Sequence, residues 1–288
     1  MIKNKSFLLF LLFSIFLEKG YAQNTVLDIR FATVNNIDLK LDLYMPDQKS
    51  DPYLVVWVHG GAWHSGSKEN PPMDLLKKGY ALASIDYRTT RIEKFPAQIH
   101  DIKAAVRFLR ANADKYKFHS DKIFLWGSSA GGHLVALAGV TNDINNLEGK
   151  VGDHLEVSSA VQGIIDFYGP TDLSTIMAQS TPHGIEVRGP ALELMFGKSL
   201  DKCVEELKVA SPVNYISTDD PPLFICHGDQ DIQVPINQSI ELLGRYQVAH
   251  LPVEIEYVYG AGHGGKQFND PTLINKVNDF LKNIISAK

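Results

Sequence analysis

Two adjacent serines stand between glycines in the segment FLWGSSAGGH, residues 124–133. Its core, GSSAG, matches the pattern GxSxG, which is typical of a nucleophile elbow, a tight turn between a strand and a helix. Ser129 is the central residue, so its hydroxyl would project above a sheet and could attack a carbonyl carbon. Ser128 is then a small spacer. Since the chain has 22 glycines, the pattern can also arise by chance, and the neighbouring segments must decide.

A second glycine motif, HGGAW, closes the apolar run YLVVWV. Consecutive glycines let the backbone curl, so that amide N–H groups can face the negative charge that develops on a substrate oxygen. The candidate donors form an oxyanion hole, and they are Gly60, Gly61, Ala62 and, directly after the nucleophile, Ala130.

An acid and a base follow two further apolar runs. CHGDQDIQVP offers Asp229 and Asp231, and YGAGHGG offers His263. A serine hydroxyl needs an imidazole to remove its proton, and the imidazole needs a carboxylate to orient it. The order Ser129, Asp231, His263 is that of the α/β-hydrolase arrangement. No motif with metal-ligand spacing accompanies them, so we expect neither a metal nor an organic cofactor.

The remaining pattern places these residues at strand ends. Residues 25–34 and 38–46 alternate apolar and polar side chains, which favours an antiparallel pair at a sheet edge. Six short apolar runs follow, separated by segments of helical period, and they favour buried parallel strands. The sequence therefore predicts one α/β domain over residues 23–288, with about eight mostly parallel strands and helices on both faces. Together with the motifs above, this order resembles the α/β-hydrolase fold. In such sheets, ligands bind and catalytic residues lie at the carboxyl ends of the strands.

Residues 171–218 interrupt this alternation, because they contain at least one amphipathic helix but no buried strand. An insertion at this point is expected to form a small cap, either a lid or a wall of the pocket. Plain packing helices are the alternative.

Three further side chains each allow two interpretations of their role. Trp63 is expected to bind substrate beside the oxyanion loop, although an aromatic residue there can equally well pack. Arg88, in IDYR, favours a structural ion pair over a substrate contact, since the arginine fork readily fixes loops. His133 is expected to pack or to form a local hydrogen bond.

The first residues predict export. MIKNK is basic, the following run to Leu17 is apolar, and small residues precede Gln23, which is the layout of a signal peptide over residues 1–22 with cleavage after Ala22. The run is shorter than the ~20 residues of a membrane span, so no stable membrane anchor is expected. The protein is then secreted or periplasmic. Cys203 and Cys226 could pair in that setting, but an apolar context around Cys226 favours free thiols.

The amino-acid composition and net charge limit the classes of partner that we expect for this protein. The chain has 288 residues, 44% of them hydrophobic and 21% charged, and a net charge of -5. This suits one large globular domain, and the absence of a basic stripe excludes nucleic acid as a partner. The oligomeric state stays open.

Taken together, these segments resemble one branch of the α/β-hydrolase superfamily. The match runs through HGGAWHSGSK, GYALASIDYR, GSSAGGHLVALAG, DFYGPTDL, PPLFICHGDQDIQVP and GAGHG. It is similar to the bacterial bifunctional acetylxylan and feruloyl esterases, within the hormone-sensitive-lipase-like group. The resemblance implies that Asp231, the second aspartate of HGxxD, is the acid, and that Asp229 fills a variable position.

The same resemblance implies an ester substrate, an oligo- or polysaccharide such as xylan that carries acetyl or feruloyl groups. The alternatives are a small-molecule carboxylesterase or lipase-like enzyme of this fold, an arylformamidase, and a non-catalytic binding protein.

Overall fold

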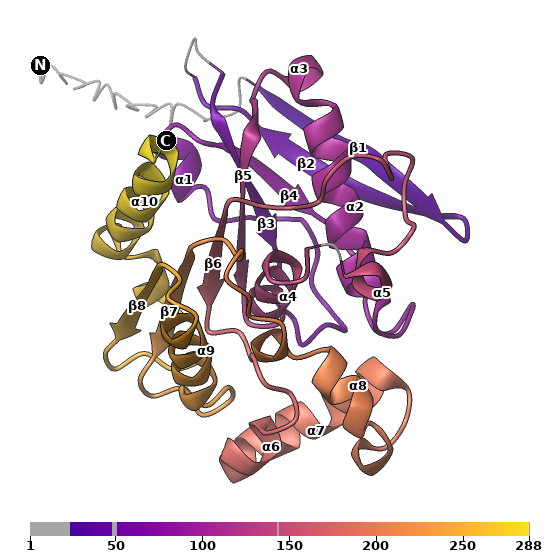
Figure 1. Ribbon diagram of the computed structural model, residues 1–288, viewed down its shortest axis with the longest axis vertical. Helices are drawn as coiled ribbons and strands as arrows, with labels where there is room; N and C mark the ends of the chain where they lie inside the picture. The colour runs from indigo at the N-terminus through magenta and orange to yellow at the C-terminus, as the bar shows by residue number, and fades with distance from the viewer. Residues whose placement is uncertain (1–23, 48–50, 143, 288) are drawn as a thin grey trace, which may run out of the picture.

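The computed structural model describes residues 24–47, 51–142 and 144–287. These residues contain an eight-stranded sheet in the order β1-β2-β4-β3-β5-β6-β7-β8 (Figure 1). β1 pairs antiparallel with β2 and β2 with β4, whereas the other neighbours are parallel, so the predicted α/β-hydrolase fold with an antiparallel edge is confirmed. The strands are β1 (Thr25–Val34), β2 (Ile37–Tyr44), β3 (Tyr53–Val58), β4 (Ala81–Ile85), β5 (His119–Ser128), β6 (Gly163–Phe167), β7 (Leu223–Gly228) and β8 (Val253–Val258).

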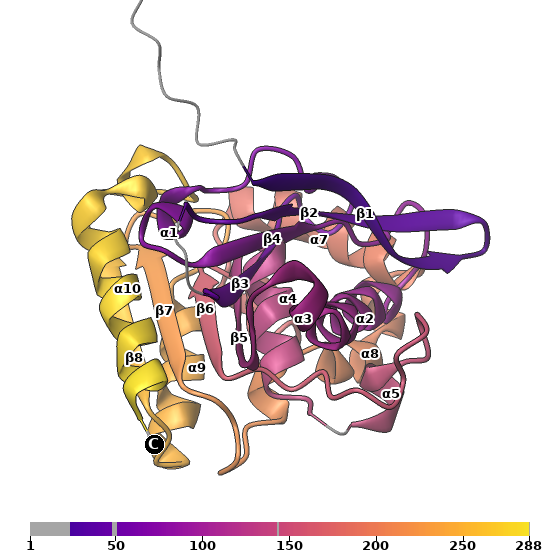
Figure 2. The ribbon, with the colours of Figure 1, turned by 90° about the horizontal axis from the view of Figure 1, so that it is seen from above.

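Helices cover both faces of the sheet (Figure 2). α2, α4 and α9 pack on one face, and α1 and α10 lie together on the other. The helices are α1 (Asp74–Lys77), α2 (Ala97–Ala111), α3 (Ala113–Tyr116), α4 (Ala130–Gly139), α5 (Asn145–Glu148), α6 (Ile176–Gln179), α7 (Pro182–Phe196), α8 (Val204–Val209), α9 (Asn237–Val248) and α10 (Pro271–Ser286).

Strand periodicity divides the interior into two cores, because successive side chains of a strand point to opposite faces. In β3, Leu54 and Val56 belong to the core beneath α2 and α4, whereas Val55 between them belongs to the core beneath α10. All three are fully buried. This two-sided burial explains why the central strands are continuous apolar runs.

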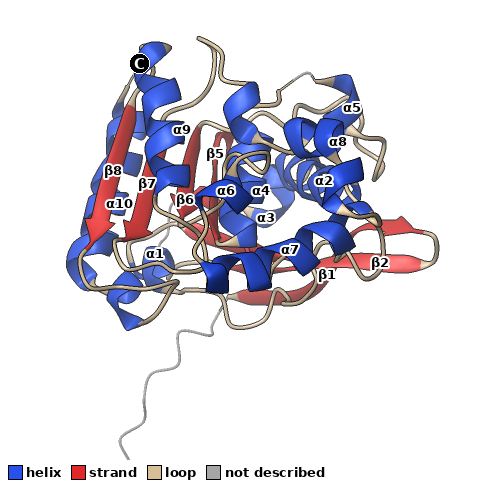
Figure 3. Ribbon diagram, turned by 90° about the horizontal axis from the view of Figure 1, so that it is seen from below, coloured by secondary structure: helices blue, strands red, loops and turns tan. Residues whose placement is uncertain are grey.

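The insertion at residues 171–218 contains α6, α7, α8 and two short 3-10 turns, and no strand. α7 starts at a helix cap, where the Thr181 hydroxyl accepts a hydrogen bond from the Gly184 N–H at 3.1 Å. It ends at Gly197, which has a left-handed φ of 72°. Figure 1 shows α6, α7 and α8 gathered at the lower end of the molecule, and Figure 3 shows them on the side that faces the viewer.

The predicted signal peptide, residues 1–22, lies outside the described residues and stays a prediction. Within the described ranges, no helix is both long and apolar enough to cross a bilayer. Cys203 and Cys226 are both buried and unpaired, which confirms the expectation of free thiols.

A buried ion pair anchors the loop that follows β4. The guanidinium of Arg88 donates to both carboxylate oxygens of Asp101 on α2, from Nε at 2.9 Å and from Nη2 at 2.7 Å. The Arg88 N–H donates to the same carboxylate at 2.8 Å, and both side chains are buried. The structural role expected for Arg88 is therefore confirmed.

Replacing Asp101 with Ala should lower the free energy of unfolding by about 3–5 kcal/mol, because it leaves the Arg88 guanidinium buried without its counter-charge. Urea denaturation monitored by circular dichroism measures this loss. As a control, Glu241→Ala breaks the solvent-exposed pair with Arg245 and should cost at most about 1 kcal/mol. Equal losses in the two variants would contradict the anchoring role.

Candidate active site

The backbone turns from β5 into α4 within a single residue, Ser129. Its φ of 54° and ψ of -120° are unusual for a residue with a side chain and are held only by close surroundings. A Cβ at Gly127 would overlap the Gly131 backbone, and one at Gly131 would overlap the Val58 carbonyl. The Ser129 N–H also donates to the Phe167 carbonyl at 2.8 Å. The glycines thus permit the turn, and the neighbouring strands hold it.

Three side chains distant in sequence form one hydrogen-bonded chain at the strand ends. Ser129 Oγ lies 2.7 Å from His263 Nε2, and His263 Nδ1 lies 2.7 Å from Asp231 Oδ2. Because an ionised carboxylate only accepts hydrogen bonds, Nδ1 carries the proton of the neutral imidazole. Nε2 is then the acceptor and faces the serine hydroxyl, the tautomer that a general base requires.

The carboxylate of Asp231 is fully buried yet held in its charged form. Its Oδ1 accepts from the Gln233 and Val234 N–H groups at 2.8 and 2.9 Å. Burial by itself raises the pKa of Asp231, but hydrogen bonds from His227, His263 and Val234 outweigh it and hold that pKa well below its usual range. Asp231 therefore stays ionised and can stabilise an imidazolium at His263.

The neighbouring acid, Asp229, lies outside this chain of contacts. Its Oδ1 accepts from the Gly260 N–H at 2.6 Å, so it closes the turn after β8. His227, which the sequence analysis did not single out, supports the acid loop instead. Its Nε2 donates to the Val234 carbonyl at 3.0 Å and lies 3.3 Å from Asp231 Oδ2. Its position as the histidine of HGxxD was the available signal.

The predicted oxyanion residues lie around Ser129. Within the described part of the chain, no residue accepts a hydrogen bond from the N–H groups of Gly61, Ala62 or Ala130. Gly61 and Ala62 have φ values of 103° and 48°, so the loop curls as its glycines allow. Gly60 packs closely against the elbow, since a Cβ there would lie 2.9 Å from the Ser128 carbonyl oxygen. These amide groups are thus available to a substrate oxygen.

The histidine of HGGAW, His59, supports the oxyanion loop through a ring contact and hydrogen bonds. The His59 ring stacks on Tyr87, with ring centroids 4.3 Å apart. Its Nδ1 donates to the Gly60 carbonyl at 2.7 Å, and the Tyr87 hydroxyl donates to the His59 carbonyl at 3.2 Å. Burial lowers the pKa of His59, which favours this neutral, hydrogen-bonded ring.

The expectation that Trp63 binds substrate is wrong. Its side chain is fully buried and is not part of the cavity wall beside Ser129. The indole Nε1 donates to His133 Nδ1 at 3.0 Å, and His133 Nε2 donates to the Ala210 carbonyl at 2.7 Å. Since a buried indole N–H needs an acceptor, His133 makes this buried position of the side chain possible. His133 packs in the core, as expected, but its hydrogen bonds are not local, because the partners lie 70 and 77 residues away in the sequence.

A cavity of about 380 Å³ opens in front of Ser129. Its wall combines strand-end loops with α7, so the insertion contributes to the pocket. Sequence analysis missed Tyr168, whose ring meets the His263 ring edge-on at 5.0 Å, although its place directly after β6 was a signal. Nothing in the sequence marked Arg188 or Gln233. The lining residues are Gly60, Gly61, Ala62, His64, Ser65, Ser128, Ser129, Tyr168, Val187, Arg188, Gln233 and His263.

The fold is that of an α/β-hydrolase, and at its strand ends a serine, a histidine and a buried aspartate form one hydrogen-bonded chain. The chain belongs to the BD-FAE family, whose sequence model matches residues 41–246. A truncated carbohydrate esterase from gut microbiota is 30% identical, with a TM-score of 0.83 over 93% of this chain and 100% of that one. A bifunctional GH43-CE of Bacteroides eggerthii is 33% identical, with a TM-score of 0.82 over 91% of this chain and 35% of that one.

Esterase LipC of Mycobacterium tuberculosis is 30% identical over 221 residues, which are 73% of this chain and 52% of that protein. The chain spans about half the length of the curated relatives that it matches first. Esterase 2 of Thermogutta terrifontis, a solved structure, is 27% identical, with a TM-score of 0.75 over 91% of this chain and 95% of that one.

Replacing Ser129 with Ala should abolish covalent labelling by an organophosphate and lower turnover of 4-nitrophenyl acetate by several orders of magnitude, as removal of a triad member does. Mass spectrometry of the intact protein measures the labelling. Ser128→Ala is the matched control and should still be labelled, because its hydroxyl is not the one that faces His263. Retained turnover in clean Ser129→Ala protein would refute the assignment.

Replacing His133 with Gln should change how stability depends on pH. Burial lowers the pKa of His133 from 6.5 to about 4. Between these values the unfolded chain binds a proton that the folded chain does not, so stability is lost as the pH falls from about 6.5 to about 4. This loss amounts to about 3 kcal/mol and should be absent from the variant. Urea denaturation at pH 7 and pH 4 measures it, and parallel losses in both proteins would contradict it.

Proposed function

We propose that this protein is a serine carboxylic ester hydrolase that works through an acyl-enzyme. The observation that carries the proposal is the continuous chain from Ser129 through His263 to Asp231. It opens on a cavity, beside three amide groups that have no acceptor among the described residues. Each part matches a step of acyl transfer.

In the first half of the reaction, His263 Nε2 takes the proton of Ser129 as Oγ bonds to the ester carbonyl carbon. The carbonyl oxygen becomes an oxyanion, which accepts hydrogen bonds from Gly61, Ala62 and Ala130. His263 then gives the proton to the departing alcohol oxygen as the ester bond breaks. In the second half, water takes the place of the alcohol, and the acid product and free Ser129 are released.

The acyl group is proposed to be acetyl or feruloyl, on a plant-type oligo- or polysaccharide such as xylan. Two similar structures support this, one named a carbohydrate esterase and one a bifunctional GH43-CE. The predicted signal peptide supports it as well, because a polysaccharide substrate lies outside the cell. We propose accordingly that the protein acts after export, as a secreted or periplasmic enzyme cleaved after Ala22.

A general carboxylesterase that acts on small esters is the second candidate. The names of other relatives favour it, since LipC is called an esterase and the Thermogutta protein a thermophilic esterase. Both candidates use the same triad, so they differ only in substrate.

Incubation with acetylated and feruloylated xylan should release acetate or ferulate, and 4-nitrophenyl esters should be cleaved fastest when the acyl chain is short. Chromatography of the released acids measures the first, and absorbance of 4-nitrophenol the second. Ser129→Ala protein is the control for background hydrolysis. If the protein prefers long acyl chains and releases no acid from xylan, the carbohydrate substrate is refuted and the protein is a general carboxylesterase.

A further inference from the structure

Arg188 brings a buried positive charge to the wall of the catalytic cavity. It lies on α7, in the insertion, and it lines the cavity together with Ser129 and His263. Its side chain is only 1% exposed. Among the described residues it has one marginal hydrogen bond, from Nη2 to Gln233 Oε1 at 3.5 Å. Nε and Nη1, which together carry three of its five N–H donors, have no partner among the described residues.

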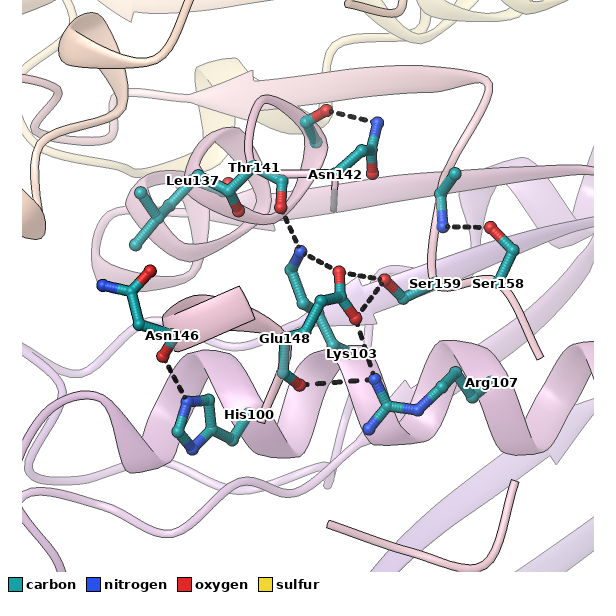
Figure 4. A network of polar contacts seen from close by, with 12 residues as sticks. His100, Lys103, Arg107, Leu137, Thr141, Asn142, Asn146, Glu148, Ser158 and Ser159 are labelled. Carbon is teal, nitrogen blue, oxygen red and sulfur yellow. Dashed lines mark hydrogen bonds and ion pairs between the residues drawn. The ribbon is translucent and has the colours of Figure 1, made fainter. Parts of the chain in front are cut away.

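The other buried cationic side chains described in the structure are paired with carboxylates. Arg88 is paired with both oxygens of Asp101. Arg107 donates from Nη1 to Glu148 Oε2 at 3.0 Å, and Lys103 donates to the other oxygen of the same carboxylate (Figure 4). Of the three arginines that are buried in the described residues, only Arg188 lacks a carboxylate. Burying a charge without a counter-charge is costly, and such a cost is usually explained by function.

The carboxylate whose charge acts on Arg188 already has hydrogen-bond partners. Asp231 contributes to the electrostatic field at Arg188, but its oxygens are taken by His263, His227 and two backbone N–H groups. No ion pair joins Asp231 to Arg188 in the described structure. Burial lowers the pKa of Arg188 to about 10, against the raising effect of Asp231, so the side chain stays charged at neutral pH.

We propose that Arg188 binds a carboxylate group of the ester substrate, close to the scissile bond. The planar guanidinium fork fits a carboxylate with two parallel hydrogen bonds, and inside a small cavity such a pair is strongly selective. The substrate class is therefore an ester with a carboxylate in its acyl part or in its alcohol part, as in an acylated acidic sugar. This inference rests on the proposed hydrolase function and makes its substrate more specific.

Two substrate pairs locate the carboxylate. In the acyl pair, 4-nitrophenyl hydrogen succinate is compared with its neutral amide, 4-nitrophenyl succinamate. In the alcohol pair, 4-acetoxybenzoate is compared with 4-acetoxybenzamide. After subtraction of the uncatalysed rate, the natural protein should prefer the carboxylate in one pair by about 10-fold or more in kcat/KM, the effect of a charge-assisted hydrogen bond.

Three variants test whether Arg188 is responsible. Arg188→Met should remove the preference, and Arg188→Lys should keep part of it, because it keeps the charge but loses the fork. Arg245→Met removes the same charge from an exposed surface pair on α9 and should keep the full preference. If Arg188→Met lowers both members of each pair equally, Arg188 is a structural support and the inference is overturned.

A measurement on the natural protein covers the case in which Arg188→Met does not fold. Benzoate should inhibit turnover of 4-nitrophenyl acetate at a concentration about 10-fold lower than benzamide does. Turnover of these esters with no preference for a carboxylate substrate or inhibitor overturns this inference alone. No turnover of any ester by clean protein overturns the proposed function, and the inference with it.

Discussion

At Ser129 the backbone passes from β5 to α4 in one step, with a φ of 54° that a residue with a side chain keeps only when its surroundings hold it there. The surroundings are the Gly127 and Gly131 contacts, the Val58 carbonyl and the hydrogen bond from the Ser129 N–H to Phe167. Three neighbouring strands therefore have to be in register before the nucleophile can face His263. The sheet is thus the part of the molecule that makes the site possible.

A second constraint joins the elements around this turn. The buried Trp63 indole, at the end of the oxyanion loop, donates to His133 on α4, and His133 donates to Ala210 at the end of α8. Both ring nitrogens of His133 are used, and protonation would break the contact with Trp63. One neutral imidazole therefore links the oxyanion loop, the elbow helix and the insertion.

Two buried charged side chains, Asp231 and Arg188, differ in how completely the protein satisfies their hydrogen-bonding atoms. Asp231 is surrounded by donors and stays an anion, so its role as the partner of His263 is built into the resting structure. Arg188, which lines the cavity, has almost none of its donors satisfied by the described residues. A site that fully pairs its own acid but leaves a buried cation unpaired is electrostatically prepared for an acidic group from outside.

The sequence by itself determined the order of strands and helices and the positions of Ser129, Asp231 and His263. It could do so because two-sided burial produces continuous apolar runs, and because the carboxyl ends of parallel strands meet at one edge. Only the tertiary structure decided that Trp63 points into the core, that Tyr168 lies against His263 and that Arg188 reaches the cavity. Those outcomes depend on loop backbone angles and on how the insertion packs, and neither leaves a periodic pattern in the sequence.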